Sequence, residues 1–146
     1  MEISIFSRLP EEVIVNHIMP FAYKIQKKEL LKDIQYYNMD LNSCRIFYDW
    51  NSLLRDMIHF INLNLKTRFG RINAITIFKR IYALKDKSDR EINEYINKFS
   101  VLDKDTYVNK RKARQLFGLL NRYERVEFFN VYVLSVFNVN GHEANT

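Results

Sequence analysis

Apolar residues recur at steps of three and four positions along most of this chain of 146 residues. This spacing gathers them on one side of an α-helix, so the pattern predicts a succession of amphipathic helices. The clearest stripe consists of Leu54, Met57, Ile58, Ile61 and Leu65. The expected helices cover residues 9–18, 26–38, 50–68, 72–84, 88–99, 103–120 and 121–136, with a polar connection at 39–43.

Residues typical of helix ends support these segments. Pro10 suits a first helical turn, and Glu11 and Glu12 suit the positive end of the helix dipole. Pro20 should end or kink the first helix, because it lacks an amide proton. The expected caps further on are Asp49 or Asn51, Ser88 with Glu91, Asp103 or Asp105, and Asn121 with Glu124, and Gly70 is the expected stop of the 50–68 helix.

The last apolar segment, residues 128–137, allows two interpretations. Its β-branched and aromatic residues favour a strand by propensity, and 131–136 would suit an edge strand. The cap signal at Asn121 and the spacing of the apolar residues favour a helix. We expect the helix and keep the strand as the alternative.

Composition favours an all-α protein with one core. Hydrophobic residues make up 47% of the chain, including 11 Phe and 9 Tyr, which is enough to build a core. The 3 Gly and 2 Pro are too few for the tight turns of an all-β sandwich. We therefore predict a single helical domain over 1–146, made of six or seven helices. Its parts are a helical start at 9–38, a helical body at 45–137 and a polar tail at 138–146.

Cys44 is the only cysteine, so the chain cannot form an internal disulfide or a site with four thiolate ligands. A reducing compartment fits this usage. The longest strongly apolar run, 131–137, is far shorter than the ~20 residues that span a bilayer, and we read no export signal at the N-terminus. We expect neither secretion nor a membrane span.

No catalytic, cofactor-binding or metal-binding motif is recognisable. His17, His59 and His142 lack the spacing that places two ligands on one helical face. The carboxylate pairs stand at expected helix starts, where capping explains them. We therefore expect no enzyme, no cofactor and no metal.

The formal net charge of +6 keeps nucleic acid as one alternative partner. The densest cationic cluster consists of Lys110, Arg111, Lys112 and Arg114, which could meet phosphates along one helix. A solvated helix face explains the same charges, and we favour that interpretation because no nucleic-acid-binding motif accompanies them.

Large aromatic residues are candidate anchors of a protein interface, because such side chains are enriched at binding hot spots. The candidates are Tyr36, Tyr37, Tyr48, Trp50 and Phe128. The competing interpretation is that these rings fill the core.

The run from Leu9 through Pro10 and Ile14 to Ile18 resembles the opening of an F-box, a helical motif that docks onto Skp1-type adaptors of ubiquitin ligases. Past Ile18 the resemblance ends, because Met19-Pro20 interrupts the helix. If this resemblance holds, Leu9, Pro10, Ile14 and Ile18 are interface residues.

Over its length the chain resembles small helical proteins of nucleocytoplasmic large DNA viruses. Three blocks carry this resemblance: Leu30-Leu31-x-Asp33-Ile34, Trp50-x-x-Leu53-Leu54-x-Asp56 and Gly118-Leu119-Leu120-x-x-x-Glu124-Arg125. It implies a non-enzymatic structural component of a virus particle, such as a minor capsid or cement protein that bridges other capsid proteins in the virion, made in the host cytoplasm. The alternatives are an F-box-like adaptor and a basic protein associated with nucleic acid.

Overall fold

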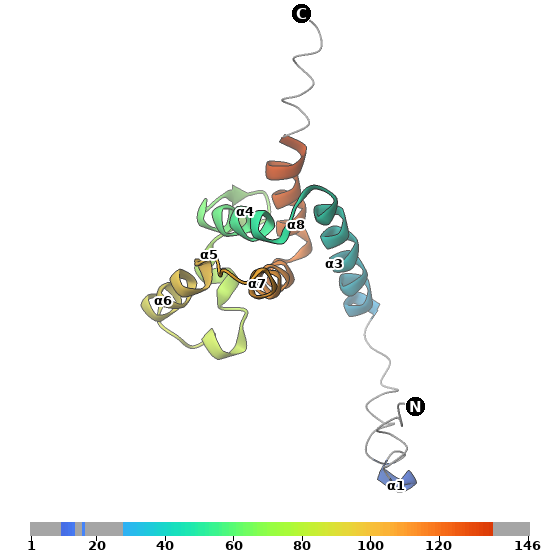
Figure 1. Cartoon of the computed structure of the whole chain (residues 1–146). Helices are drawn as coiled ribbons and strands as arrows, with labels where there is room; N and C mark the ends of the chain where they lie inside the picture. Colours follow the sequence, from blue (N-terminus) through green and yellow to red (C-terminus); the bar gives the residue numbers. More distant parts are fainter. Residues whose placement is uncertain (1–9, 14–15, 17–27, 136–146) are drawn as a thin grey trace, which may run out of the picture. The chain divides into compact units, whose positions relative to one another are not determined.

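The computed structural model describes residues 10–13, 16 and 28–135, and the contacts divide the chain into two units, 1–32 and 33–146. These residues are mostly helical, which confirms the predicted all-α class (Figure 1). The α-helices are α1 (Glu11–Val13), α3 (Lys28–Phe47), α4 (Trp50–Asn62), α5 (Ala74–Phe78), α6 (Asp89–Ser100), α7 (Thr106–Leu119) and α8 (Arg122–Phe128). The remaining elements are strands β1 (Lys66–Thr67) and β2 (Gly70–Arg71), the 3₁₀ turn η3 (Tyr82–Leu84) and the π-helical turn η4 (Phe129–Leu134).

The helix starts follow the predicted caps. Asp49 accepts hydrogen bonds from the amides of Asn51 and Ser52 at the start of α4, and Asp105 accepts one from Tyr107 at the start of α7. Reciprocal capping boxes open two other helices, as predicted. They are formed by Ser88 with Glu91 at α6 and by Asn121 with Glu124 at α8.

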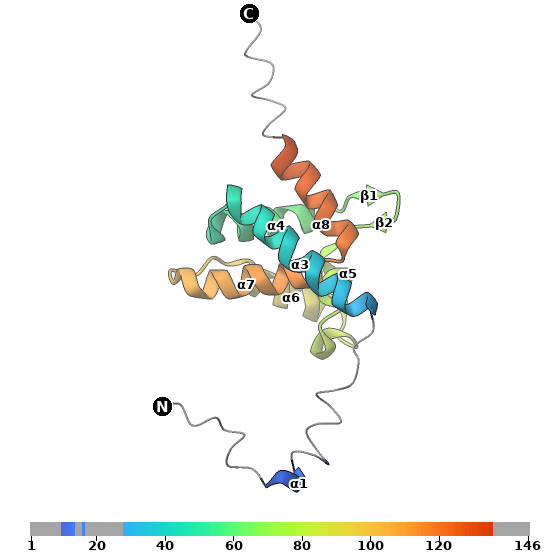
Figure 2. The same ribbon diagram turned by 90° about the vertical axis from the view of Figure 1, so that its right-hand side faces the viewer.

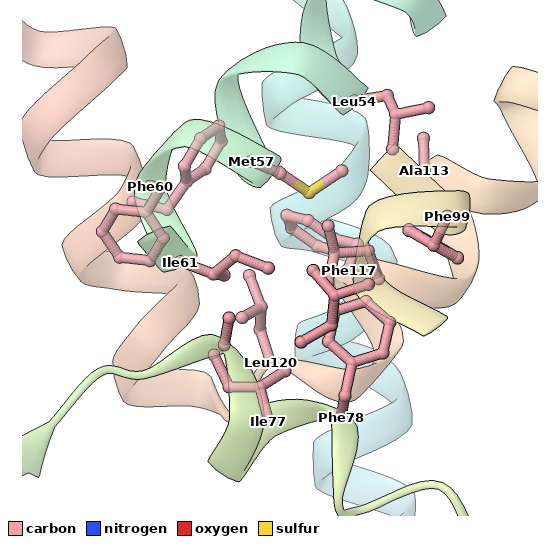
Figure 3. Packing of buried hydrophobic residues seen from close by; sticks show 14 of the residues in the cluster. Leu54, Met57, Phe60, Ile61, Ile77, Phe78, Phe99, Ala113, Phe117 and Leu120 are labelled. Atoms are coloured by element: carbon pink, nitrogen blue, oxygen red, sulfur yellow. The ribbon is translucent and has the colours of Figure 1, made fainter. Parts of the chain in front are cut away.

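The core of the second unit lies between α4 and α7, which pack along one another (Figures 1 and 2). Figure 3 shows the side chains that converge there from these helices, from α5 and from α6. Met57, Phe60, Ile77 and Phe117 are among those with no exposed surface. Burying one such side chain stabilises the fold by about 2 kcal/mol, so this packing supplies most of its stability.

One continuous helix, α3, replaces the predicted helix at 26–38 and the predicted connection at 39–43. Leu41 and Cys44 are both buried on its inner side, three residues apart. Ser43 donates its hydroxyl to the carbonyl of Met39 one turn earlier. The polar composition of 39–43 therefore does not mark a loop, because the segment holds neither glycine nor proline to end the helix.

The predicted helix at 50–68 ends early, at Asn62, and a hairpin follows. Asn64 adopts a positive φ of 53°, which takes the chain out of the helix. The side chain of Thr67 then holds the turn, because its Oγ1 accepts from the amide of Phe69 and donates to the carbonyl of Gly70. Lys66 pairs with Arg71 across the two antiparallel strands. The predicted stop at Gly70 is therefore a strand residue.

The predicted helix at 72–84 is also broken, into α5 and the turn η3. Ile81 has an extended backbone, with ψ 121°, between the two. Just before it, Arg80 turns toward α8, where it binds the carboxylate of Glu124 and the carbonyl of Leu119. This long-range contact outweighs the helical periodicity of the segment.

The last apolar segment is helical as far as the structure describes it, so the strand alternative is wrong there. α8 continues directly into the π-helical turn η4. The turn carries Val133 into the core and sets Tyr132 against Phe60 and Phe128, with ring centroids 6.2 and 5.2 Å away. Tertiary packing thus decided between two states that propensity left open.

Asn109 is a fully buried polar residue that joins three segments. Its side-chain Nδ2 donates to the side chain of Asn51 and to the backbone carbonyl of Asp103, and its Oδ1 accepts from the backbone amide of Asp103.

We predict that Asn109→Ala lowers the free energy of unfolding by about 2 kcal/mol, because these buried groups lose their partner. Urea unfolding measures the effect, with Asn93→Ala on the exposed side of α6 as control. Equal unfolding midpoints for both variants would contradict the prediction.

Candidate functional site

A groove runs between the inner side of α3 and the start of α8, within the second unit. We call it the α3–α8 groove. It encloses about 180 Å³ and is lined by Asp40, Ser43, Cys44, Phe117, Arg125, Val126 and Phe129. Helix α3 supplies one wall, and α8 with the first residue of η4 supplies the other. Because both walls are helices, the spacing of the lining residues is set by tertiary packing.

The floor of the groove is a buried arginine. The side chain of Arg125 is 2% exposed, and its Nε and Nη2 atoms bind the carboxylates of Asp40 at 3.0 Å and Asp33 at 3.1 Å. Its Nη1 donates to the carbonyl of Leu120 at 2.9 Å. The guanidinium also lies about 6 Å from the ring centroids of Tyr37 and Phe117. Each nitrogen therefore has a protein partner, and the group serves to hold α3 against α8.

A second ion pair fixes the start of α8 beside the groove. Arg80 binds both carboxylate oxygens of Glu124, at 2.6 and 2.7 Å. Glu124 is buried and also accepts from the amide of Asn121 in the capping box. This two-point contact ties α8 to the end of α5.

The rim of the groove is apolar and exposed. Val126, which lines the groove from α8, is 45% exposed, and Phe129, which lines it from the first position of η4, is half-buried. Val126 also borders a second hollow with Arg122 and Tyr123, so the apolar surface continues along α8. Exposed apolar surface that surrounds a concave, polar-floored site is typical of macromolecular contact.

Burial raises the pKa of one thiol and two phenols in this part of the protein. Burial, and then the negative charge of Asp40, raise the pKa of Cys44 to about 12. Burial, followed by a hydrogen bond to Asp56, raises the pKa of Tyr48 well above its usual value. Burial likewise raises the pKa of Tyr132, whose hydroxyl is hydrogen-bonded to Nδ1 of His59. The two phenols are hydrogen-bonded to residues of α4, Tyr48 from the connection that follows α3 and Tyr132 from η4, whereas Cys44 is a buried neutral thiol.

The predicted aromatic anchors have different environments. Phe128 is fully buried in the core, so the isolated chain offers none of its surface to a partner, which corrects the prediction for this residue. Tyr37, Tyr48 and Trp50 are half-buried and pack against the core. The ring of Tyr36 lies under the guanidinium of Arg122, 3.4 Å from its centroid. The structure does not bring these residues together in one patch.

Three of the four F-box-like positions lie where the structure is not described. Leu9, Ile14 and Ile18 lie outside the described residues, while Pro10 is exposed at the start of α1.

None of the helices in the described ranges is both long enough and apolar enough to cross a bilayer. Within the same ranges, no group of three or more His, Cys, Asp or Glu side chains is arranged to hold a metal ion.

The predicted polyanion contacts all lie on α7, but they point in different directions. The ammonium of Lys110 sits 5.5 Å from the ring centroid of Trp50. Lys112 donates to the carbonyl of Val101, whereas Arg111 and Arg114 are exposed. Arg114 shares a face with Lys110 and Arg111, four and three residues earlier, but Lys112, two residues from Lys110 and from Arg114, points elsewhere, so the four cations form no single stripe.

Sequence reasoning missed the groove because its residues come from three distant helices. One local signal for it exists in the sequence, because Arg125 directly follows Glu124 of the predicted capping box.

Comparison with protein-family models, with curated protein sequences and with solved structures finds no match.

We predict that Cys44 makes stability depend on alkaline pH. In the unfolded chain a thiol ionises near pH ~8.5, whereas the folded chain holds the proton until about pH 12. The unfolded state therefore loses the proton first, and the free energy of unfolding should fall by up to about 1.4 kcal/mol per pH unit above that point. Urea unfolding between pH ~8.5 and ~9.5, below the tyrosine range, measures this slope. Cys44→Ala should flatten it, and an equal slope in both proteins would contradict the assignment.

We predict that Trp50 stabilises the fold from the edge of the core. Its ring packs on the core and has the guanidinium of Arg45 at 4.1 Å from its centroid. Trp50→Ala should lower the free energy of unfolding by about 2 kcal/mol, through lost packing and lost cation–π contact. Trp50→Phe, which keeps a ring, should lose less. A thermal melt of Trp50→Ala that matches the wild type would instead favour a role in an interface.

Proposed function

We propose that this chain is a non-enzymatic protein that works by binding other proteins, and that the α3–α8 groove is its contact surface. The observation that carries this proposal is the contrast between floor and rim. The floor is an arginine that is 2% exposed and held by Asp33, Asp40 and a carbonyl, so it is preformed. The rim exposes Val126 to solvent, and the half-buried ring of Phe129 lines it as well. A preformed, partly apolar concavity binds a partner at a small cost in conformational entropy.

The chemistry of the groove supports binding over catalysis. Its thiol stays protonated far above neutral pH, because burial raises the pKa of Cys44 to about 12. Its guanidinium is fully engaged with protein groups. A nucleophile or an anion-binding arginine would need the opposite properties, an ionised thiol or a free donor.

We further propose that the partners are structural proteins of a large DNA virus particle, which makes this chain a minor capsid or cement protein. The support is the resemblance of the three sequence blocks. Two of these blocks meet at Arg125, because Asp33 of the first block binds Arg125 of the third. The blocks therefore share a structural role in this chain. An F-box-like adaptor remains the alternative proposal.

We predict that a photo-crosslinking residue at Val126 captures a discrete protein partner. The full chain carries benzoylphenylalanine at Val126 and is irradiated in purified particles or in extracts of the cells that produce it. The control carries the same residue at Val101, which is exposed but lines none of the hollows described here. Val126→Asp in a chain with the crosslinker at Ser43 should abolish the adduct while the fold is retained.

The crosslinked partner decides between the two proposals. A capsid or core protein, with the chain present in stoichiometric amounts in purified particles, supports the structural proposal. Capture of a Skp1-type adaptor supports the F-box-like alternative. Adducts at Val101 and Val126 that match in identity and yield would overturn the assignment of the groove.

A further inference from the structure

We infer that the β1–β2 hairpin is a docking site for an acidic segment of a partner protein. This inference rests on the proposed protein-binding function and adds the chemistry of the partner. We call this site the hairpin site and define it by Lys66, Arg68, Phe69, Arg71 and Tyr123.

The first observation is an uncompensated concentration of positive charge. Residues 57–85 contain no Asp or Glu but six Lys and Arg: Lys66, Arg68, Arg71, Lys79, Arg80 and Lys85. Ion pairs engage two of these, Lys79 with Asp89 and Arg80 with Glu124. Lys66, Arg68 and Arg71 are exposed on the hairpin and form no ion pair with the described residues.

The hairpin also places two like charges opposite one another. Lys66 and Arg71 are partners across the strands, so their side chains leave the same face of the ribbon. Like charges in this arrangement destabilise a sheet, and here only two residues of each strand hold the ribbon together. An anion bound between the two side chains would remove this repulsion.

The third observation is an exposed aromatic anchor beside the charges. Phe69, at the tip of the hairpin, is 58% exposed and contacts Tyr123 of α8, with ring centroids 3.4 Å apart and ring planes tilted by 42°. Both rings border a hollow of about 110 Å³ that also includes Ile72, Asn121 and Glu127. The hollow has room for a small apolar side chain and offers polar groups to a peptide backbone.

Carboxylates fit this site better than phosphates. Stacking of nucleic acid bases needs free ring faces, but Phe69 and Tyr123 cover one another. A peptide supplies carboxylates for the three cations together with an apolar side chain for the hollow.

The test uses the full chain and a short fluorescein-labelled peptide rich in glutamate with one central valine. Fluorescence anisotropy should show binding that weakens as salt is added. The variant Arg68→Glu/Arg71→Glu should bind roughly ten-fold more weakly, because two attractive contacts become repulsive. The matched control Lys98→Glu/Lys104→Glu makes the same change in net charge at two exposed lysines of other segments and should bind like the wild type.

Two further variants separate the contributions. Phe69→Ala keeps the charge and should weaken binding through the lost apolar contact. Lys66→Gln/Arg71→Gln relieves the repulsion between the strands, so it should weaken binding while the hairpin folds at least as well, which circular dichroism and the urea midpoint check. This variant keeps the test informative if the charge reversal perturbs the fold.

Other outcomes would overturn the inference. They are the absence of peptide binding by the wild type, equal loss in the control double variant, or tighter binding of oligothymidylate or of phosphatidylserine vesicles than of the peptide. The crosslink from the α3–α8 groove distinguishes this failure from failure of the proposed function. If Arg68→Glu/Arg71→Glu leaves the groove crosslink intact and the peptide does not bind, the groove remains a protein-binding surface and only the hairpin site is rejected.

Discussion

The buried guanidinium of Arg125 constrains the second unit more than any other single group described here. A charge that is 2% exposed must be compensated within the protein, because an unpaired buried ion costs several kcal/mol. Asp33 and Asp40 supply this compensation from two points on α3, about two helical turns apart, and the carbonyl of Leu120 supplies it from the end of α7. The angle and the register of α3 against the start of α8 are therefore fixed by the geometry of one planar side chain.

The groove and its neighbouring network follow from this constraint. Once α3 is anchored at Arg125, its helical surface and α8 stand apart far enough to leave a concavity of about 180 Å³. The contact of Arg80 with Glu124 holds the other side of α8, so the wall that carries Val126 is fixed from two directions. Rigid walls, neutral buried hydroxyl and thiol groups and an apolar rim suit recognition of a partner surface. This surface continues through Tyr123 to the hairpin, where Lys66, Arg68 and Arg71 form no ion pair with the described residues.

The sequence blocks that suggested a viral family carry structural contacts in this chain. Asp33 and Arg125 come from the first and third blocks and bind one another, and Asp56 of the second block is hydrogen-bonded to Tyr48. These residues hold helices together in this chain. The proposed recognition of a partner rests instead on exposed residues, such as Val126 and Phe69.

The sequence by itself determined the helical class and most helix starts, because periodicity and capping act over a few residues. The caps at Ser88 and Asn121 needed no tertiary information, whereas the sequence left Asp49 and Asp105 as one of two candidates each. The length of α3, the hairpin after α4 and the break near Ile81 were decided by contacts between distant segments. The groove could not be predicted from the sequence for the same reason. Arg125 binds Asp40 and Asp33, which precede it by 85 and 92 positions in the chain. Only the folded chain brings a buried charge and its counterions together, and their mutual compensation is a property of the whole arrangement.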